Sequence, residues 1–296
     1  MKLGFIGLGA MGRPMALNLM KGGHEMAVWA RRAQSAQPLL DAGARAFATP
    51  AEVARNSDVV FTMVTAGQDV EEVVLGRDGI VHGARGGSVV IDCSTIPTAT
   101  IRKVGMALRE RQIELLDAPV SGGEPGAVAG TLSIMVGGDE AVFERMRPLL
   151  ACIGKTLVYI GAMGAGQVAK AANQLALVVS IQGIAEAMVF ARANGVDFKP
   201  VWKALMQGLA GSKMLEIVGQ RMIKREFVMG IDASLHHKDS HIVLQTAKES
   251  CTATPGAALA AQAFNALFSE PGTRWDSAAI LKVLEAASGF PERESR

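Results

Sequence analysis

The stretch KLGFIGLGAMG at residues 2–12 decides the fold class of this chain. Apolar residues 3–6 predict a β-strand, a helical pattern follows at residues 11–21, and the glycines between them match G-x-G-x-x-G. In this context the first glycine permits a tight turn, the second lets a pyrophosphate approach the backbone, and the third allows close helix–strand packing. The helix N-terminus offers free N–H groups to phosphate. We therefore predict a dinucleotide-binding loop rather than a purely structural turn. The residues of this loop are Gly7, Leu8, Gly9, Ala10, Met11 and Gly12.

The composition indicates a soluble globular protein large enough for two domains. Of its 296 residues, 49% are apolar and 20% are charged, which is too apolar for a disordered chain. The 30 basic and 28 acidic residues give a formal net charge of +2, so we expect no basic stripe and no binding of nucleic acid. The 33 glycines follow no three-residue period, which excludes collagen.

The sequence also predicts a cytoplasmic location and no membrane span. Three distant cysteines, Cys93, Cys152 and Cys251, indicate reduced thiols. Glycines, an arginine and a proline interrupt the apolar N-terminal stretch, which is typical of a strand, turn and helix rather than of a signal peptide. No uninterrupted apolar run approaches the roughly 18 residues of a membrane helix, so residues 175–181 are predicted to lie in a buried helix.

The first half of the chain alternates strand and helix patterns. Apolar strands separated by helices predict a parallel sheet buried on both faces, which is a doubly wound Rossmann-type α/β domain. The expected strands are residues 3–7, 25–29, 59–63, 88–92, 114–117, 133–136 and 156–160. The expected helices between them include residues 11–21, 50–55, 98–111 and 140–150.

After about Tyr159 the pattern becomes all-helical. Apolar residues keep helical spacing over residues 167–194, and an Asn-Gly pair then gives a typical helix C-terminus. Further helices are expected between breaks near residues 208–212, 230, 254–256 and 271–272.

These patterns predict two domains joined in the glycine-rich loop at residues 161–166. Residues 1–163 are expected to bind the nucleotide, and residues 164–296 to form a helical domain with a frayed tail at 292–296. Its long apolar helices carry more apolar surface than a small domain hides, so a homodimer or homotetramer is expected.

The end of the second predicted strand bears on the choice of cofactor. An acidic residue there would bind the ribose 2′-hydroxyl of NAD, whereas arginine suits the 2′-phosphate of NADP. Residues 28–32 read VWARR, and a guanidinium holds phosphate through paired hydrogen bonds. NADP(H) is therefore favoured, with NAD(H) as the alternative. Arg31 and Arg32 could instead simply begin an exposed helix.

Four ordered motifs give the chain a resemblance to the β-hydroxyacid dehydrogenase (3-hydroxyisobutyrate dehydrogenase-like) family. They are the glycine motif extended to residue 19, DAPVSGG at 117–123, GQVAKAAN at 166–173 and HKD at 237–239. The resemblance runs to about Leu284. It implies that the second motif binds substrate, that the third is the catalytic helix and that the fourth closes over the cofactor.

A further segment narrows the resemblance. Residues 124–145, which include GTLSIMVGGD, look most similar to the branch that reduces tartronate semialdehyde (2-hydroxy-3-oxopropanoate) to D-glycerate. Gln174 stands where the family more commonly has a second Asn, and that branch is similar in carrying Gln. The resemblance implies NAD(P)H-dependent reduction of this substrate. The alternatives are a dehydrogenase for 3-hydroxyisobutyrate, 4-hydroxybutyrate or a β-hydroxy amino acid, and, from another class, a non-catalytic NADP-binding sensor.

Polar side chains share one face of the otherwise apolar helix after Gly166. They are Gln167, Lys170, Asn173 and Gln174. Because such a stripe costs desolvation energy unless it lines a wet site, we expect Lys170 to face a cleft rather than snorkel from a helix start. In the implied mechanism Lys170 is the general acid and base, and Asn173 holds the substrate hydroxyl or Lys170 itself.

The segment Ser121-Gly122-Gly123 is the expected binding site for the substrate carboxylate. Two successive glycines expose backbone N–H groups, and the serine adds a hydroxyl, although an ordinary glycine turn has the same pattern. With Lys170 and Asn173 these residues are expected to bind a small carboxylate-bearing semialdehyde or hydroxy acid.

The remaining expected cofactor residues are Val64, Thr65, Thr95 and Lys238. The first three follow the carboxyl ends of predicted strands, where ligands bind in open α/β sheets. The resemblance assigns Lys238 to the cofactor, with Asp239 orienting neighbouring groups. The spacing of His237 and His241 is compatible with a metal site, but the lysine between them would repel a cation, so no metal is expected.

Overall fold

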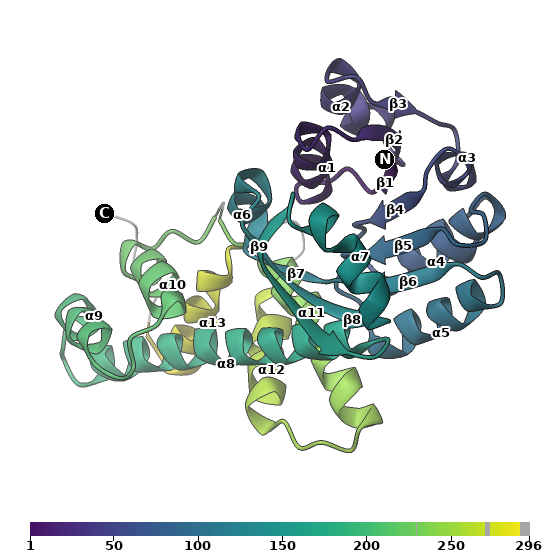
Figure 1. Ribbon diagram of the computed structural model, residues 1–296. Coiled ribbons are helices and arrows are strands. Elements are labelled where there is room, and N and C mark those ends of the chain that lie inside the picture. Colours follow the sequence, from purple (N-terminus) through teal and green to yellow (C-terminus); the bar gives the residue numbers. More distant parts are fainter. Residues whose placement is uncertain (229, 270–272, 291–296) are drawn as a thin grey trace. The chain divides into compact units, whose positions relative to one another are not determined.

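The computed structural model describes residues 1–228, 230–269 and 273–290 (Figure 1). The chain forms two compact units, Met1–Lys170 and Ala171–Arg296. The predicted helix break at residues 271–272 and the predicted frayed tail at 292–296 lie outside the described residues.

The N-terminal unit is built on a nine-stranded sheet. Its strands are β1 (Lys2–Ile6), β2 (Glu25–Trp29), β3 (Arg45–Ala46), β4 (Val59–Thr62), β5 (Val89–Asp92), β6 (Glu114–Asp117), β7 (Val120–Ser121), β8 (Leu132–Gly138) and β9 (Gly154–Gly161). The first six pair in the order β3-β2-β1-β4-β5-β6, and all five pairs are parallel. The order reverses direction between β1 and β4, which confirms the doubly wound Rossmann-type class and puts the glycine loop at this reversal.

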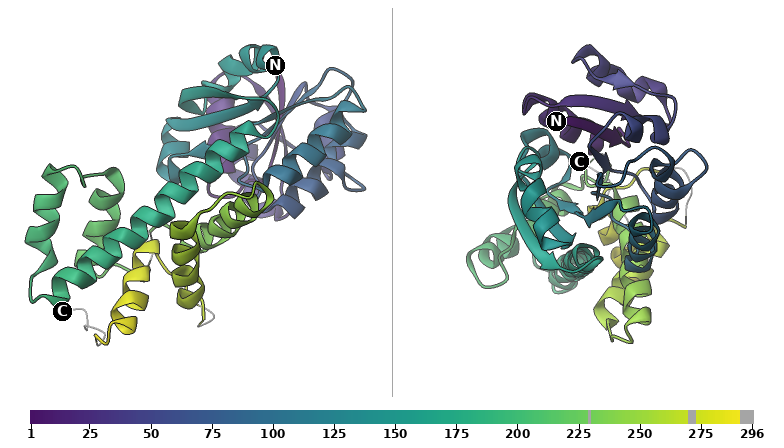
Figure 2. Two further views of the ribbon diagram at one scale, coloured as in Figure 1. Left: turned by 90° about the horizontal axis from the view of Figure 1, so that it is seen from below. Right: turned by 45° about the vertical axis from the view of Figure 1, so that its right-hand side comes forward.

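Helices cover both faces of this sheet, as Figures 1 and 2 show. Alternate residues of each central strand enter different apolar cores: Phe5 and Phe61 belong to one, Ile6 and Val60 to the other. The first core includes residues of α1 (Gly12–Lys21), α2 (Gln37–Asp41), α6 (Gly123–Ala129) and α7 (Glu140–Leu150). The second includes residues of α3 (Pro50–Arg55), α4 (Gly67–Leu75) and α5 (Thr98–Arg109). The central strands are therefore buried on both sides, as their apolar sequences predict.

The sheet is not wholly parallel, so the prediction of a parallel sheet is wrong at one side. β8 runs antiparallel to β6 and to β7, and β9 is parallel to β8. The reason is that the segment after β6 forms the short strand β7, which itself pairs with β8. β9 is also not buried on both faces, because Val158 and Ile160 are exposed.

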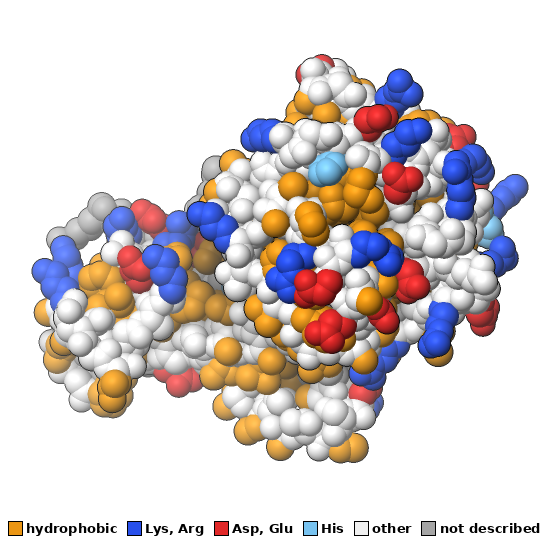
Figure 3. Space-filling view, viewed as in Figure 1, with side chains coloured by type: hydrophobic (Ala, Val, Ile, Leu, Met, Phe, Trp, Pro, Cys, Tyr) orange, Lys and Arg blue, Asp and Glu red, His pale blue; other side chains and the backbone are white. Residues whose placement is uncertain are grey.

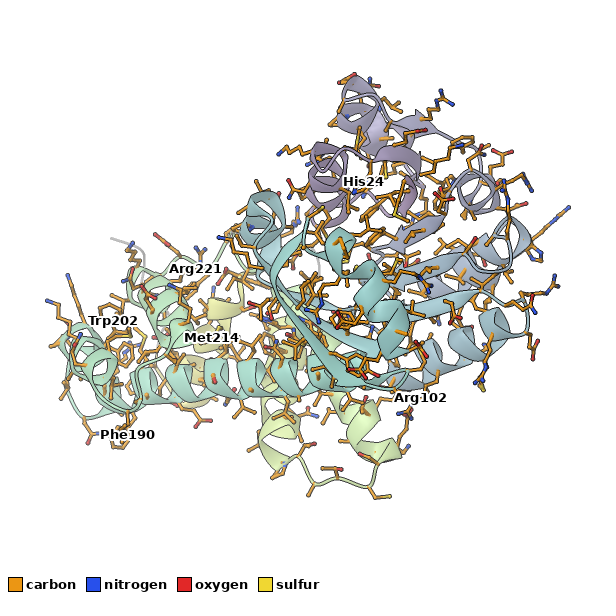
Figure 4. All side chains as sticks on the ribbon, viewed as in Figure 1. His24, Arg102, Phe190, Trp202, Met214 and Arg221 are labelled. Atoms are coloured by element: carbon orange, nitrogen blue, oxygen red, sulfur yellow. The ribbon has the colours of Figure 1, made fainter. Side chains whose placement is uncertain are left out.

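The second unit is helical, as predicted. Its helices are α8 (Ala165–Ala193), α9 (Phe198–Gln207), α10 (Lys213–Lys224), α11 (Ala233–Glu249), α12 (Pro255–Leu267) and α13 (Ile280–Ala287). The predicted breaks at residues 208–212, 230 and 254–256 fall between these helices or, at the last, at the first turn of α12. Trp202 of α9 and Met214 of α10, labelled in Figure 4, pack against the core of this unit, and the Trp202 indole donates a hydrogen bond to the Leu215 carbonyl at 2.9 Å.

The 29-residue helix α8 begins in the first unit and continues through the second. The two compact units meet between Lys170 and Ala171, inside this helix, whereas the sequence predicts a boundary at 163/164. α8 is long and apolar enough to cross a membrane, with a mean hydropathy of 1.6 over an 18-residue window, 44% of which is buried. Core helices of soluble proteins pass the same test. The segment predicted to be buried is buried on one face only, because Val178 and Ile181 are fully buried whereas Ala176, Val179 and Ser180 are exposed.

Candidate active site

The glycine loop has the geometry that a dinucleotide pyrophosphate requires. Gly7 has φ +96°, and a Cβ there would collide with the Met63 carbonyl oxygen, while a Cβ at Gly12 would collide with the Gly7 carbonyl oxygen. Around Gly9, in contrast, a Cβ would meet open space. Within the described residues no side chain caps the N-terminus of α1, and its first turn holds no acid. The loop therefore fits a phosphate ligand, because the backbone is open and the N–H groups of the helix are available.

Arg31 and Arg32 follow the end of β2, and both are exposed. Arg31 Nη1 lies 3.5 Å from Asp69 Oδ1, at the start of α4. Asp69 also accepts a hydrogen bond from the Ala66 N–H at 3.1 Å, so this acid is held by its own helix. The sequence near β2 does not indicate this contact, because Asp69 lies in α4, which follows β4.

Hydrogen bonds among buried polar side chains link the carboxyl ends of β4 and β5. The hydroxyls of Thr62 and Ser94 each donate to Asp92 Oδ1 at 2.7 Å, and the Val64 N–H donates to the Ser94 hydroxyl at 3.0 Å. Thr62, Asp92 and Ser94 are fully buried. This arrangement fixes the backbone on either side of the predicted cofactor residues Val64, Thr65 and Thr95.

Two further side chains connect the ends of β5 and β6 to the first turn of α8. Asp117 accepts hydrogen bonds from the N–H groups of Gly164 at 2.7 Å and Gln167 at 2.8 Å. The Gln167 amide donates to the Ser94 carbonyl at 2.7 Å and accepts from the Ile96 N–H at 3.1 Å. Gln167 thus holds both peptide groups that flank Thr95.

The buried surroundings of the Asp117 carboxylate change its pKa. Burial raises the pKa of Asp117 to about 6, and Asp92 also raises it, while the hydrogen bonds from Gly164 and Gln167 oppose the change. An ionised Asp117 therefore carries a desolvation cost that its position at the N-terminus of α8 only partly offsets.

Lys170 lies on α8, three residues after Gln167, and only 8% of it is exposed. The predicted partner Asn173 follows one turn later on the same helix and is partly buried. A lysine this well buried is unusual, because the charged form loses hydration, and such groups are frequent at catalytic sites.

The predicted carboxylate site lies where β7 ends and α6 begins. Gly122 has φ +136° and Gly123 has φ +62°, so both adopt backbone conformations that favour glycine. Both glycines are exposed, and Ser121 is partly buried. The segment thus presents backbone at the surface of the first unit.

In the helical unit, Lys238 and Asp239 lie on α11 beside Gln174 of α8. Lys238 Nζ is 3.1 Å from Asp239 Oδ1, and the Gln174 amide donates to Asp239 Oδ2 at 2.6 Å. The Asn173 amide donates to Gln174 Oε1 at 2.8 Å. Four of the residues singled out by the sequence are therefore joined directly.

His237 and His241 stack edge to face, and their Nε2 atoms lie 3.3 Å apart. His237 Nε2 is also 2.8 Å from Asn265 Oδ1. Over residues 1–228, 230–269 and 273–290, no three His, Cys, Asp or Glu side chains are grouped as metal ligands. Cys93 is fully buried beside Asp92, and burial raises the pKa of its thiol.

Sequence reasoning missed the group formed by Thr62, Asp92 and Ser94, and it left Asp117 and Gln167 without these roles. A usable signal was present. Both β5 and β6 are apolar strands that end in aspartate, and an acid at the end of a strand buried on both faces needs a partner.

The fold and the glycine loop together define a dinucleotide-binding protein. Residues 2–161 match the family described as the NAD binding domain of 6-phosphogluconate dehydrogenase. Residues 164–284 match the family described as NAD-binding of NADP-dependent 3-hydroxyisobutyrate dehydrogenase. The chain therefore belongs to the 3-hydroxyisobutyrate dehydrogenase-like family of NAD(P)-dependent oxidoreductases.

Individual relatives match over almost their whole length. A 2-hydroxy-3-oxopropionate reductase of Escherichia coli is 43% identical, with 96% of this chain and 97% of the relative covered. An NAD-dependent L-serine dehydrogenase of Pseudomonas aeruginosa is 36% identical, with 97% and 99% covered. The solved structure of Mycobacterium tuberculosis 3-hydroxyisobutyrate dehydrogenase with L-serine has a TM-score of 0.89 and 29% identity, with 96% and 98% covered. Relatives that act on different hydroxy acids are thus similar to this chain, which is itself a β-hydroxyacid dehydrogenase.

Proposed function

We propose that this enzyme reduces tartronate semialdehyde to D-glycerate with NADPH. The observation that carries the chemistry is Lys170, buried on a helix whose first turn is hydrogen-bonded to the ends of β5 and β6. The 43% identity to a 2-hydroxy-3-oxopropionate reductase supports this particular substrate. The nicotinamide, when bound, supplies a hydride to the carbonyl carbon of the substrate.

The proposed roles of the side chains follow from their chemistry. Lys170, as an ammonium, gives its proton to the alkoxide that develops at the substrate carbonyl oxygen, and it takes a proton in the reverse direction. Ser121 and the N–H groups of Gly122 and Gly123 hold the carboxylate, and Asn173 holds a hydroxyl. Fixing the carboxylate orients the carbonyl, which contributes to rate by lowering the entropy cost of the reaction.

The proposed cofactor is NADP(H), with NAD(H) as the alternative. The residues from Gly7 to Gly12 would hold the pyrophosphate, and Arg31 with Arg32 would hold the 2′-phosphate. Val64, Thr65, Thr95 and Lys238 would line the rest of the site. The absence of an acid at the end of β2 and the exposure of both guanidiniums support the phosphate-bearing cofactor.

A second candidate substrate is L-serine, oxidised at its β-hydroxyl. The Pseudomonas aeruginosa relative is an L-serine dehydrogenase, and the Mycobacterium tuberculosis structure was solved with L-serine. L-serine shares the small size and the carboxylate of the first candidate, but it carries an ammonium where tartronate semialdehyde carries a hydroxyl.

Lys170→Ala tests the proposed chemistry. We expect kcat for tartronate semialdehyde reduction to fall about 10²- to 10⁴-fold, because general acid catalysis is lost. NADPH binding, followed by its fluorescence, should persist. Lys170→Met is the matched variant that keeps the volume of the side chain and should show the same loss.

The substrate is tested by steady-state assays of the wild type. Tartronate semialdehyde with NADPH should give the highest kcat/KM, against methylmalonate semialdehyde and succinate semialdehyde in reduction and L-serine in oxidation. A higher kcat/KM for another of these compounds would identify that compound, and not tartronate semialdehyde, as the preferred substrate. In the test of the lysine, unchanged turnover in Lys170→Ala would show that Lys170 is not the general acid. The cytoplasmic location and the homo-oligomer stay predictions.

A further inference from the structure

Four polar side chains of the helical unit form a continuous chain of contacts from α11 to α8. The chain runs from Lys238 to Asp239 at 3.1 Å, from Asp239 to Gln174 at 2.6 Å, and from Gln174 to Asn173 at 2.8 Å. Asp239 is 6% exposed and Gln174 is 4% exposed. Because both residues are largely shielded from water, these hydrogen bonds have little competition from solvent. We call this set of residues the amide chain.

The chemistry of Asp239 sets the direction of every hydrogen bond in the amide chain. A carboxylate only accepts hydrogen bonds, and the donors around it are the Lys238 ammonium and the Gln174 amide. Gln174 must therefore turn its NH2 group toward Asp239, which leaves Oε1 facing Asn173. Asn173 must in turn present Nδ2 to that oxygen. The bond to Gln174 uses one of the two N–H groups of Asn173, so this arrangement fixes the orientation of the Asn173 amide and leaves Oδ1 and the second N–H for a ligand.

The length of the Gln174 side chain allows it to bond both Asp239 and Asn173. Its side chain is one methylene longer than the Asn that is commoner at this position, and it spans from α8 to the carboxylate on α11 while bonding its own neighbour Asn173. The departure from the commoner residue therefore has a structural consequence, which is to link the orientation of Asn173 to Asp239.

We infer that Asp239 and Gln174 are positioning residues that fix the orientation of the Asn173 amide, with Oδ1 as its acceptor, and thereby select semialdehydes that carry a hydroxyl beside the carbonyl. This inference rests on the proposed function. The aldehyde and the carboxylate of tartronate semialdehyde are acceptors, and its 2-hydroxyl is its one good donor. An acceptor at Asn173 thus matches the hydroxyl, whereas malonate semialdehyde, which lacks this hydroxyl, leaves the acceptor without a partner.

The test compares these two aldehydes in Gln174→Met and Asp239→Asn. Gln174→Met keeps an unbranched side chain of similar size but cannot fix the Asn173 amide, and Asp239→Asn lets both amides reverse. We expect the KM for tartronate semialdehyde to rise about tenfold in each variant, because a hydrogen bond made in both ground and transition states is lost. The KM for malonate semialdehyde should stay within about twofold, since it makes no such bond.

Glu186→Gln is the matched control. Gln182 and Glu186 form another amide–carboxylate hydrogen bond on α8, at 2.7 Å, and Glu186 is exposed. Its loss should leave the ratio of the two KM values unchanged. The affinity for NADPH, measured by fluorescence, should be retained in Gln174→Met, because the pair of Lys238 and Asp239 stays intact.

Each other outcome has a definite meaning. If the wild type reduces both aldehydes with equal kcat/KM, or if the variants lose the same factor on both, the inference is overturned and the proposed function stands. If Gln174→Met retains the wild-type preference, the amide chain does not set it. If the wild type reduces neither aldehyde, the proposed function fails, and the inference fails with it.

Discussion

The proposed preference for NADP(H) depends on Arg31, a single exposed side chain. Its side chain is 80% exposed, and its contact with Asp69 at 3.5 Å is of a kind that contributes little to stability. Replacing this carboxylate by a 2′-phosphate would therefore cost little and would gain paired, charge-assisted hydrogen bonds. On the face in Figure 3, basic and acidic side chains are interspersed over the N-terminal unit, so the cation at this site acts locally.

Arg31→Ala is expected to raise the KM for NADPH about tenfold or more, because a hydrogen-bonded ion pair with the phosphate is lost. The KM for NADH should change much less. Steady-state kinetics with both cofactors measures the two effects, and Arg111→Ala, which removes an exposed arginine after α5, is the control. Equal changes with both cofactors would exclude Arg31 from the 2′-phosphate site.

Some residues of the candidate active site could be predicted from the sequence, and others could not. Lys170 and Asn173 stand out because polar residues at helical spacing interrupt an apolar helix. The partners of Asp117 do not, because Gly164 and Gln167 lie 47 and 50 residues away along the chain. No local pattern encodes a hydrogen bond of that separation, and the fold must be known before it can be seen.

At the scale of elements, the N-terminus of α8 depends on the protonation of Asp117. Its pKa is about 6 in the folded protein, against 3.8 for the ordinary group, and burial is the main cause. Between these values the folded state binds more protons than the unfolded state, so the contribution of Asp117 to stability falls as pH rises from about 4 to 6.

Asp117→Asn removes this titration. As pH falls from 7 to 5, the free energy of unfolding of the wild type should gain about 1 kcal/mol relative to the variant, because the wild-type carboxyl becomes neutral. Denaturant unfolding at both pH values measures the difference. Asp139→Asn, which alters an exposed N-cap of α7, is the matched control for loss of a carboxylate cap. If the wild type instead became less stable relative to Asp117→Asn as pH falls from 7 to 5, the raised pKa of Asp117 would be contradicted.

Several elements with a clear pattern of apolar residues were predicted well. The sequence places β2, β6, α3 and α7 at the bounds found in the structure. The two-residue strands β3 and β7 were not predicted, because two residues carry no periodicity. The antiparallel direction of β8 was not predicted either, since an apolar run is the same in both directions.

At the scale of the whole molecule, a buried carboxylate links three parts of the helical unit. Glu285 of α13 pairs with Arg192 of α8 at 2.9 Å and with Arg225, after α10, at 2.7 Å. Its side chain is 5% exposed, so both pairs are shielded from water. Losing one partner of such a group leaves buried charge uncompensated.

Glu285→Ala should therefore lower the free energy of unfolding of the helical unit by about 3 kcal/mol. Calorimetry, with circular dichroism at 222 nm, follows the helical transition. The control is Glu144→Ala, which removes an exposed pair with Arg147 in the first unit and should have little effect. If Glu285→Ala and Glu144→Ala lost similar amounts of unfolding free energy, burial of the Glu285 ion pairs would not contribute to stability.

Because α8 is continuous, the boundary between the two compact units lies inside a helix. The two units meet between Lys170 and Ala171, three residues before Asn173 and inside a helix of 29 residues. A gene fragment that ends at this seam would keep the lysine and lose the asparagine, and the complementary fragment would keep the reverse. A cut at this boundary would therefore separate the two residues that the proposed mechanism places on α8, so exchanging one unit for that of a relative would also exchange one member of this pair.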